Sequence, residues 1–583
     1  MDQDVYPYDT AAVSELLKHK RRTRGITSCF PCRHRKVRCD GRVPCSSCLK
    51  RGHGELCRAP SSSAQRQGNS STTQISALKK DLRAMTVAPS SSPDVTPTLA
   101  SGGALGDGRV PIRSQSKFSG RHVVEDATGA TIFLGSHSDT PLALGCREAS
   151  ASGDTMFHGG SIDHFVPRAY PFTSLWGPEA SAKDVCETLP DESDMIRYWQ
   201  AYQSTAYPFY PVLVNIDTFG FLLFEFLNQQ ASIQDRGRVG EPAEPDPSWL
   251  ALLFAVLACG AQFTHDLAKE RDLRSKVFIC SSFHCLRLSN FFNHTNMDQI
   301  QAMALIGHCL RNNLDTNSAW ILMGTTIRLA QSIGLHETST SLSPEEQVQR
   351  SRLWWTLVWQ DTFLSFTYDR PPSCFTTKNC PIPLATVSGL SFQECIFRIC
   401  QIIIEQGQLE DSGSSTASKS KASLEGLWEA AAPFLTTKAH CRSLQDHLER
   451  LALGIHLNYA ICRVGQLPHS ATSGPSNAVI ADCRRRAMQV VEHFLELHRF
   501  SKTVCRSWAF VHNAVSCAIT MHSLSHVPLN TLTDPNALAQ RLLTVLESEA
   551  RESEWYDADT NVRYFGPYSR ALKALKEIYG GNN

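Results

Sequence analysis

From about residue 191 to residue 550, apolar residues recur three or four positions apart, which is the spacing of one face of an α-helix. Polar stretches and Gly or Pro residues separate the apolar segments. The pattern predicts a mainly α fold for this part of the chain. The expected helices are 197–213 (broken at Pro208 and Pro211), 247–263, 268–292, 297–311, 316–334, 344 to the Pro371–Pro372 pair, 424–435, 441–465, 476–500, 503–526 and 534–550.

Several of these helices carry recognisable start and stop signals. Ser343 is expected to cap a helix that begins at Pro344, because serine is a favoured N-cap and proline a favoured first residue. Ser248 is expected to cap the helix at 247–263, and Gly334 is expected to end the helix that precedes it.

Asp361 falls inside a helix that is apolar nearly all round. An unpaired carboxylate would be costly there, so it needs a partner. Arg352 and Arg370 are the candidates, and a structural role is favoured over ligand binding.

Residues 58–185 read as a flexible linker rich in Ser, Pro, Gly and Thr. Within it, Ile75, Leu78, Leu82 and Met85 follow a heptad pattern. Residues 73–86 could therefore form a short coiled coil that makes a homodimer, or only a transient amphipathic turn. Alternation at Thr131–Leu134 predicts a small hairpin that packs onto the following domain.

Two further segments are predominantly polar. Residues 411–424 are expected to form a surface loop. Acidic residues cluster around Trp555 between Glu547 and Asp559, near the start of a C-terminal segment spanning 531–583. This composition fits either a transcriptional activation segment or an ordinary acidic helix end, and the second is favoured because the residues that follow look helical and packed.

The charge composition adds one feature, a basic region near the N-terminal end of the sequence. The chain has 583 residues and nearly balanced charge, with 57 Lys and Arg against 56 Asp and Glu. Between Lys18 and Arg58, however, thirteen basic residues face two acids, Asp40 and Glu55. Such a local excess suggests a polyanionic partner. No signal peptide is recognisable and no apolar run reaches the ~20 residues of a membrane span, so an intracellular protein without a membrane partner is expected.

Six of the 21 cysteines lie in this basic region, at the spacing C-x2-C-x6-C-x5-C-x2-C-x8-C. Paired C-x2-C spacing favours zinc over disulfides. Six thiolates fill two tetrahedral zinc sites only if two of them bridge both ions. A module of about 30 residues is too small for a hydrophobic core, so the metal must supply its folding energy. The six cysteines are Cys29, Cys32, Cys39, Cys45, Cys48 and Cys57.

This stretch resembles the fungal binuclear zinc-cluster DNA-binding modules, in its spacing, its basic segment, its Cys-Asp pair and its loop proline, Pro44. The resemblance implies two Zn2+ ions bridged by Cys29 and Cys45. It implies that one ion is also held by Cys32 and Cys39, and the other by Cys48 and Cys57.

The same resemblance implies binding to double-stranded DNA at CGG-type triplets. Lys36 and Arg35 would contact guanine in the major groove, where guanine offers N7 and O6 as acceptors. The remaining basic residues look like phosphate contacts: Arg33, Arg38, Lys50 and Arg51.

A second resemblance covers roughly residues 195–470. A G-x-x-x-R-x-A-x-x-x-G-L-H piece at Gly324–His336 and an R-x-W-W-x-L…D…RP piece at Arg352–Pro371 are similar to the fungal transcription-factor regulatory domain, also called the middle homology region. The resemblance implies an all-α domain. The expected organisation is a basic arm (1–28), a zinc cluster (29–57), the linker, a regulatory domain (190–530) and the C-terminal segment.

These features together predict a nuclear, sequence-specific transcription factor, with the transcription machinery or co-regulators as partners. It would control a metabolic or secondary-metabolite gene cluster. A basic run just before the first cysteine is expected to act in nuclear import: Lys18, Lys20, Arg21, Arg22 and Arg24. A zinc-stabilised protein–protein adaptor is the alternative. An enzyme is not expected, because the sequence contains no P-loop, GxGxxG, GxSxG or HExxH motif.

Overall fold

The computed structural model divides the chain into two units, residues 1–112 and 113–583, which we describe separately. In the first unit it describes residues 39–40, 42 and 45–50. In the second unit the described residues are 121–125, 131–135, 138, 146–148, 175–177, 179–235, 245–339, 341–374, 379–384, 389–407, 414–466, 476–527, 533–553, 555–557, 562–564, 572, 575–576 and 578–579.

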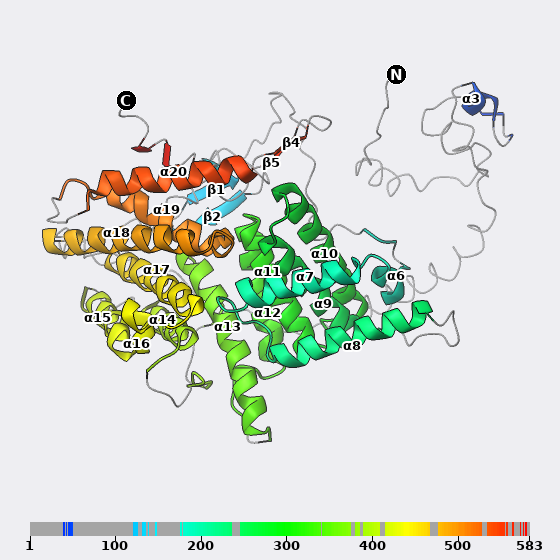
Figure 1. The fold of residues 1–583 in the computed structure, drawn as a ribbon, viewed down its shortest axis with the longest axis horizontal. Helices are drawn as coiled ribbons and strands as arrows, with labels where there is room; N and C mark the ends of the chain where they lie inside the picture. Colours follow the sequence, from blue (N-terminus) through cyan, green and yellow to red (C-terminus); the bar gives the residue numbers. More distant parts are fainter. Residues whose placement is uncertain are drawn as a thin grey trace, which may run out of the picture. The chain divides into compact units, whose positions relative to one another are not determined.

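Helices dominate the described part of the second unit (Figure 1), as the hydrophobic pattern predicts. They are α6 (Ala182–Cys186), α7 (Glu192–Ala201), α8 (Ile216–Asp235), α9 (Pro247–Phe263), α10 (Ala268–Leu288), α11 (Met297–Asn312), α12 (Thr316–Ser332), α13 (Pro344–Tyr368), α14 (Phe392–Gly407), α15 (Ser414–Ala430), α16 (Pro433–Thr436), α17 (Leu444–Gln466), α18 (Asn477–Phe500), α19 (Trp508–Ser523) and α20 (Pro535–Ser553), with a π-helical turn η3 (Tyr202–Ala206) and 3-10 turns η5 (Lys438–His440) and η6 (Val504–Arg506).

Two helices, α9 and α13, form the centre of the core. A helix that is apolar on every side must be surrounded by protein. In α9 nearly every residue from Leu250 to Phe263 is buried, and α13 buries Trp354 and Trp355 almost completely. Figure 1 shows α13 running between the group α7–α12 and the group α14–α20. One continuous hydrophobic core therefore extends across both groups.

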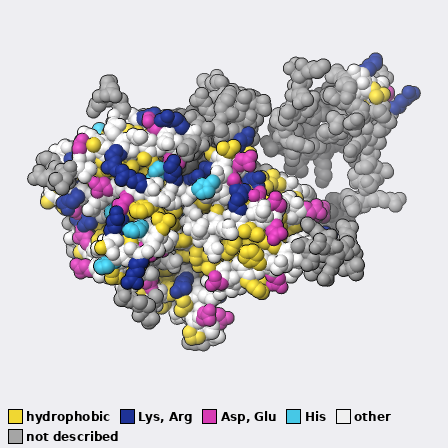
Figure 2. Space-filling view, in the orientation of Figure 1, with side chains coloured by type: hydrophobic (Ala, Val, Ile, Leu, Met, Phe, Trp, Pro, Cys, Tyr) yellow, Lys and Arg dark blue, Asp and Glu magenta, His cyan; other side chains and the backbone are white. Residues whose placement is uncertain are grey.

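The helix α8 leaves part of its apolar surface outside this core. Phe221 is 68% exposed and Phe224 is 48% exposed. Figure 2 shows hydrophobic side chains gathered on the visible face over α8 and α12. Among the described residues, no helix is both long enough and apolar enough to cross a membrane.

Most predicted helix caps are confirmed. At α13 the Ser343 hydroxyl accepts a hydrogen bond from the Glu346 amide, and the Glu346 carboxylate accepts one from the Ser343 amide at 2.9 Å, a complete capping box. Gly334 follows α12 with φ +70°, a left-handed conformation that glycine adopts without strain. The cap predicted at Ser248 is wrong. Asp246 caps α9 instead, because Pro247 occupies the first helical position and the Asp246 carboxylate accepts the Ser248 amide at 3.0 Å.

Three predicted boundaries also need correction. Regular α-helix ends at Ala201, where the π-helical turn η3 begins ahead of Pro208. The helix predicted to reach residue 292 ends at Leu288, because Asn290 takes a left-handed conformation with φ 51°. The polar loop predicted at 411–424 is wrong from Ser414 onward, where α15 begins. In this helix Lys421 pairs with Asp482 of α18 at 2.6 Å. The helix is therefore stabilised through its polar face, whereas its polar composition had suggested a loop.

The buried Asp361 does find partners, but they are not the predicted arginines. Its carboxylate accepts hydrogen bonds from the Ser373 amide at 2.6 Å and the Ser373 hydroxyl at 3.0 Å. Burial raises the pKa of Asp361 to about 6, and the hydrogen bonds from Ser373 and Cys374 oppose this rise. The chain therefore turns back after Pro371–Pro372, and Ser373 supplies the hydrogen bonds that the buried Asp361 carboxylate needs.

Arg370 instead joins α13 to a small antiparallel sheet. The strands β1 (Arg121–Glu125), β2 (Thr131–Leu134) and β3 (Cys146–Glu148) pair in the order β2-β1-β3, which confirms the predicted hairpin. Arg370 Nε and Nη2 donate to the Phe133 carbonyl at 3.0 and 2.6 Å. The Gly135 amide donates to the Tyr368 carbonyl at 3.0 Å.

Apolar contacts complete this joint. Val123, Ile132 and Leu134 bury their side chains against Tyr368 at the end of α13. The Arg370 guanidinium stacks over Tyr368 and Trp320 and donates to Asn317 at 3.0 Å. The hairpin is therefore fixed to the helical domain at the Arg-Pro end of α13, which agrees with the expectation that it packs onto the domain that follows.

The acidic C-terminal region is partly packed. Glu549, which is 3% exposed, accepts a hydrogen bond from His498 at 2.9 Å, and Glu547 pairs with Lys576 at 2.8 Å. The Tyr579 hydroxyl donates to the Ala518 carbonyl at 2.7 Å. Beyond α20, strands β4 (Trp555–Asp557) and β5 (Val562–Tyr564) form a hairpin. These contacts favour a structural role for the two described glutamates.

The joint between β2 and α13 makes a prediction about stability. A Cβ atom on Gly135 would overlap the carbonyl oxygen and side chain of Asp369, whereas no atom of the described residues lies within 4 Å of a Cβ on Gly177. Gly135→Ala should therefore lower the free energy of unfolding by about 1–3 kcal/mol relative to Gly177→Ala, measured by urea unfolding of the full chain. Because both variants gain the same rigidity in the unfolded chain, the difference isolates the overlap. Equal stability of the two variants would show that the sheet is not held at this point.

Candidate metal centre and nucleic-acid interface

The structure describes one half of the predicted zinc cluster. Cys39, Cys45 and Cys48 are described, together with Lys50. The other predicted site residues lie outside the described residues, as does the heptad segment 73–86. They are Cys29, Cys32 and Cys57, Arg33, Arg35, Lys36, Arg38 and Arg51, and Lys18, Lys20, Arg21, Arg22 and Arg24.

A one-turn helix, α3 (Ser46–Leu49), positions the second C-x2-C pair. Cys45 is its N-cap, and the Cys45 Sγ accepts a hydrogen bond from the Cys48 amide at 3.4 Å. Cys45 and Cys48 are 0% and 1% exposed, while the neighbouring Leu49 is 58% exposed. A helix start after the first cysteine brings the second cysteine back to the same side of the chain. The local sequence thus forms the turn that a C-x2-C metal site needs.

Cys39 comes to the same place from the preceding segment. The Sγ atoms of Cys39 and Cys45 and a carboxylate oxygen of Asp40 lie within 4.8 Å of one another. Two thiolates on one tetrahedral zinc, each at about 2.3 Å from the ion, lie roughly 4 Å apart. The donor set is sulfur-rich and the two cysteines are close enough to share an ion. The described residues therefore fit a zinc ion bound by Cys39 and Cys45.

Asp40 has a role that the sequence pattern did not assign. Its carboxylate accepts the Ser46 backbone amide, at 3.1 and 3.4 Å from the two oxygens. Hydrogen bonds from the Ser46 side chain and amide lower the pKa of Asp40. Asp40 thereby ties the segment carrying Cys39 to the first turn of α3, which carries Cys45 and Cys48. The available signal was an acid directly after a cysteine in a basic region, with a helix start six residues later.

Lys50 lies where α3 ends. Its backbone amide donates to the Ser46 carbonyl at 3.0 Å, and its side chain is exposed. An exposed ammonium group at this position is available to a phosphate.

Two family comparisons agree with this geometry. Residues 27–67 match the fungal Zn(2)-Cys(6) binuclear cluster domain, and residues 197–393 match the fungal specific transcription factor domain. The first domain binds two zinc ions and implies DNA binding. The chain therefore resembles the fungal transcription regulators in two separate regions.

Curated relatives are consistent with that class. The chain is 29% identical over 157 residues to "Transcription factor yanR" of Aspergillus niger, covering 25% of this chain and 19% of the relative. It is 25% identical over 399 residues to "Fusarisetin A cluster transcription factor fsa6" of a Fusarium species, covering 60% and 51%. It is 22% identical over 646 residues to the "Acetamidase regulatory protein" of Aspergillus fumigatus, covering 95% and 79%. The chain spans between 19% and 57% of the length of the first four relatives.

The position of Asp40 predicts an effect on metal binding. Groups that orient metal ligands typically contribute about 10–100-fold to metal affinity. Asp40→Asn should weaken zinc binding by the full chain at least about 10-fold in a competition assay with a chromophoric chelator, because the amide is a poorer acceptor for the Ser46 N–H. Leu49→Ala, an exposed change on the same helix, is the control. Unchanged zinc affinity in Asp40→Asn would remove Asp40 from the support of the cluster.

Proposed function

We propose that this protein is a nuclear transcription factor that reads CGG-like half-sites through its zinc cluster. The observation that carries the proposal is the six-cysteine spacing, with a basic segment that contains no acid between Cys32 and Cys39. The described geometry supports it, because the Sγ atoms of Cys39 and Cys45 lie within 4.8 Å of each other and Cys48 lies on the helix that Cys45 caps. The bound metal then presents the basic stretch to DNA.

The metal assignment in this proposal follows the resemblance to the fungal zinc-cluster modules, since ligand number alone requires only that two of the six thiolates bridge. Cys29 and Cys45 bridge the two ions, Cys32 and Cys39 complete one site, and Cys48 and Cys57 complete the other. All eight coordination positions are then occupied by sulfur. A catalytic zinc keeps an open position for water or substrate. The two ions therefore have a structural role and perform no reaction.

The basic residues divide into two roles on DNA. Arg35 and Lys36 donate to guanine N7 and O6 in the major groove, which supplies sequence preference. Arg33, Arg38, Lys50 and Arg51 contact phosphates, which supplies affinity and orientation. Lys50 is the described member of the second set, and its exposure on α3 supports that role.

Assembly and localisation complete the proposal. The heptad positions within 73–86 form a short coiled coil that makes a homodimer, so that two half-sites are bound together. The basic run from Lys18 to Arg24 directs nuclear import. The helical domain contacts the transcription machinery or co-regulators.

The proposed targets are the genes of a metabolic or secondary-metabolite pathway. Relatives named for the fusarisetin A and aurofusarin clusters and for acetamidase regulation support this range of targets. Mapping the chromosomal sites that the protein occupies, with expression measured after its deletion, tests the proposal. Occupied sites without CGG triplets, or unchanged expression of the neighbouring genes, would contradict it.

If Lys36 contacts bases, removing its side chain should weaken binding to the specific sequence more than binding to other DNA. Lys36→Ala should weaken binding to a CGG-containing duplex by about 1–3 kcal/mol and leave binding to a scrambled duplex nearly unchanged, measured by gel-shift titration at fixed salt. Lys50→Ala is the matched control. As a phosphate contact it should weaken both duplexes equally and reduce the slope of log K against log salt by about 0.9.

Two outcomes would count against this assignment. Equal loss on both duplexes in Lys36→Ala would show that Lys36 does not read bases. Binding that is weak on every duplex and insensitive to salt would favour the zinc-stabilised protein–protein adaptor over a DNA-binding factor.

A further inference from the structure

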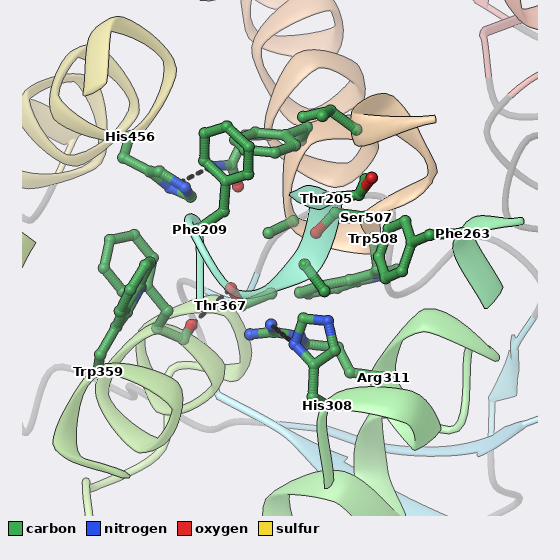
Figure 3. A pocket seen from close by; sticks show the side chains of 16 residues that line it. Thr205, Phe209, Phe263, His308, Arg311, Trp359, Thr367, His456, Ser507 and Trp508 are labelled. Carbon is green, nitrogen blue, oxygen red and sulfur yellow. Dashed lines mark hydrogen bonds between the residues drawn. The ribbon is translucent and has the colours of Figure 1, made fainter. Parts of the chain in front are cut away.

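A cavity of about 30 Å³ lies inside the helical domain, where segments distant in sequence meet. Helix α11 contributes His308 and Arg311, α13 contributes Trp359, α17 contributes His456, and Trp508 begins α19. Figure 3 shows the Arg311 guanidinium and the His308 ring reaching toward the space between Trp359, Trp508 and Phe209. The cavity is independent of the zinc cluster.

Arg311 is a buried cation without a buried anion beside it. Arg311 is 5% exposed. None of the sixteen residues that line the cavity is Asp or Glu. Within the described part of the chain, no carboxylate forms an ion pair with Arg311. Its cationic group lies over the rings of Tyr210 and Trp508, at 5.7 and 6.0 Å from their centres. Aromatic faces compensate a buried guanidinium only in part.

Among the residues that the structure describes, two hydrogen-bond donors at this place have no partner. Arg311 Nη2 lies 3.0 Å from His308 Nδ1, and since a guanidinium only donates, that histidine nitrogen must accept. The His308 proton is therefore on Nε2. Both His308 Nε2 and Arg311 Nε are buried without a hydrogen-bond partner. Each unsatisfied buried donor calls for an explanation such as a bound water or ion, and these two belong to residues that line a cavity.

The rest of the wall leaves Arg311 as the dominant charge. Burial lowers the pKa of His308 well below its usual value and that of His456 to about 3, and the nearby Arg311 lowers both further. Both imidazoles are neutral at physiological pH as a result. Thr205 and Ser507 add hydroxyl groups, and the aromatic rings provide an apolar surface.

We propose that this cavity binds a small carboxylate, with its negative charge on Arg311 and its apolar part against the aromatic rings. The planar fork of a guanidinium matches a carboxylate, and the neutral His308 can donate a further hydrogen bond. The volume corresponds to roughly two water-sized positions, so the probe must be of the size of acetate. This inference goes beyond DNA binding and does not depend on it.

Thermal unfolding of the full chain without DNA tests the proposal. Acetate should raise the midpoint by about 2 °C or more in a saturable manner, because a ligand that binds the folded state stabilises it. Ionic strength is held constant with the larger anion isethionate. Acetamide, which has the same shape without the charge, should produce no rise, and chloride should produce a smaller rise than acetate.

Variants identify the site. Arg311→Met should remove most of the acetate effect, while Arg328→Met, an exposed change on the neighbouring helix α12, should retain it. Should Arg311→Met fail to fold, Arg311→Lys keeps the charge without the fork. The apparent Kd of Arg311→Lys for acetate, measured by calorimetric titration, should be about 10-fold higher than that of the unaltered protein.

Four results would overturn the proposal. These are no rise with acetate, an equal rise with acetamide, an equal rise in Arg311→Met, or an unchanged Kd in Arg311→Lys. An equal rise with chloride would overturn the carboxylate assignment, because the site would then recognise charge alone. None of these results bears on DNA binding, which is measured separately.

Discussion

Coordination of zinc by thiolate is the interaction on which the proposed function depends, because the module between Cys29 and Cys57 is too short to bury a hydrophobic core. In its described part the buried side chains are the small thiols of Cys45 and Cys48, and the apolar Leu49 beside them faces solvent. One turn of helix and the Asp40–Ser46 hydrogen bonds prearrange these thiols. Metal binding supplies the remaining folding energy, so the shape presented to DNA exists only with the ions in place.

The helical domain, in contrast, is stabilised by a hydrophobic core. Its central helices α9 and α13 are surrounded by apolar neighbours, and the buried carboxylate of Asp361 is satisfied by the nearby Ser373. Arg370 then links the end of α13 to the β1–β2 hairpin. Arg311 has no such partner: among the described residues no carboxylate pairs with its buried charge, and its side chain lines a cavity. That difference is why the cavity beside it, rather than Asp361, is the candidate ligand site.

Sequence patterns predicted the fold class, most helices and the hairpin, because helical periodicity, capping residues and strand alternation are local properties. The partner of Asp361 could not be predicted, because it depends on how the chain turns back after Pro371–Pro372. The start of α15 was missed because its stabilising contact, Lys421 with Asp482, comes from a distant helix. Cysteine spacing predicted the zinc cluster, whereas the role of Asp40 and the cavity at Arg311 required coordinates.

The zinc content of cysteine variants tests the central claim most directly, because the account assigns Cys45 to both ions and Cys48 to one. Purified full-length protein should contain two zinc ions per chain by elemental analysis. Cys45→Ala should lose both ions, because neither site keeps four ligands, while Cys48→Ala should retain zinc at the site that includes Cys39. If Cys45→Ala still holds two zinc ions, the bridging assignment is wrong, and with it the argument that the metal cluster folds the DNA-reading segment.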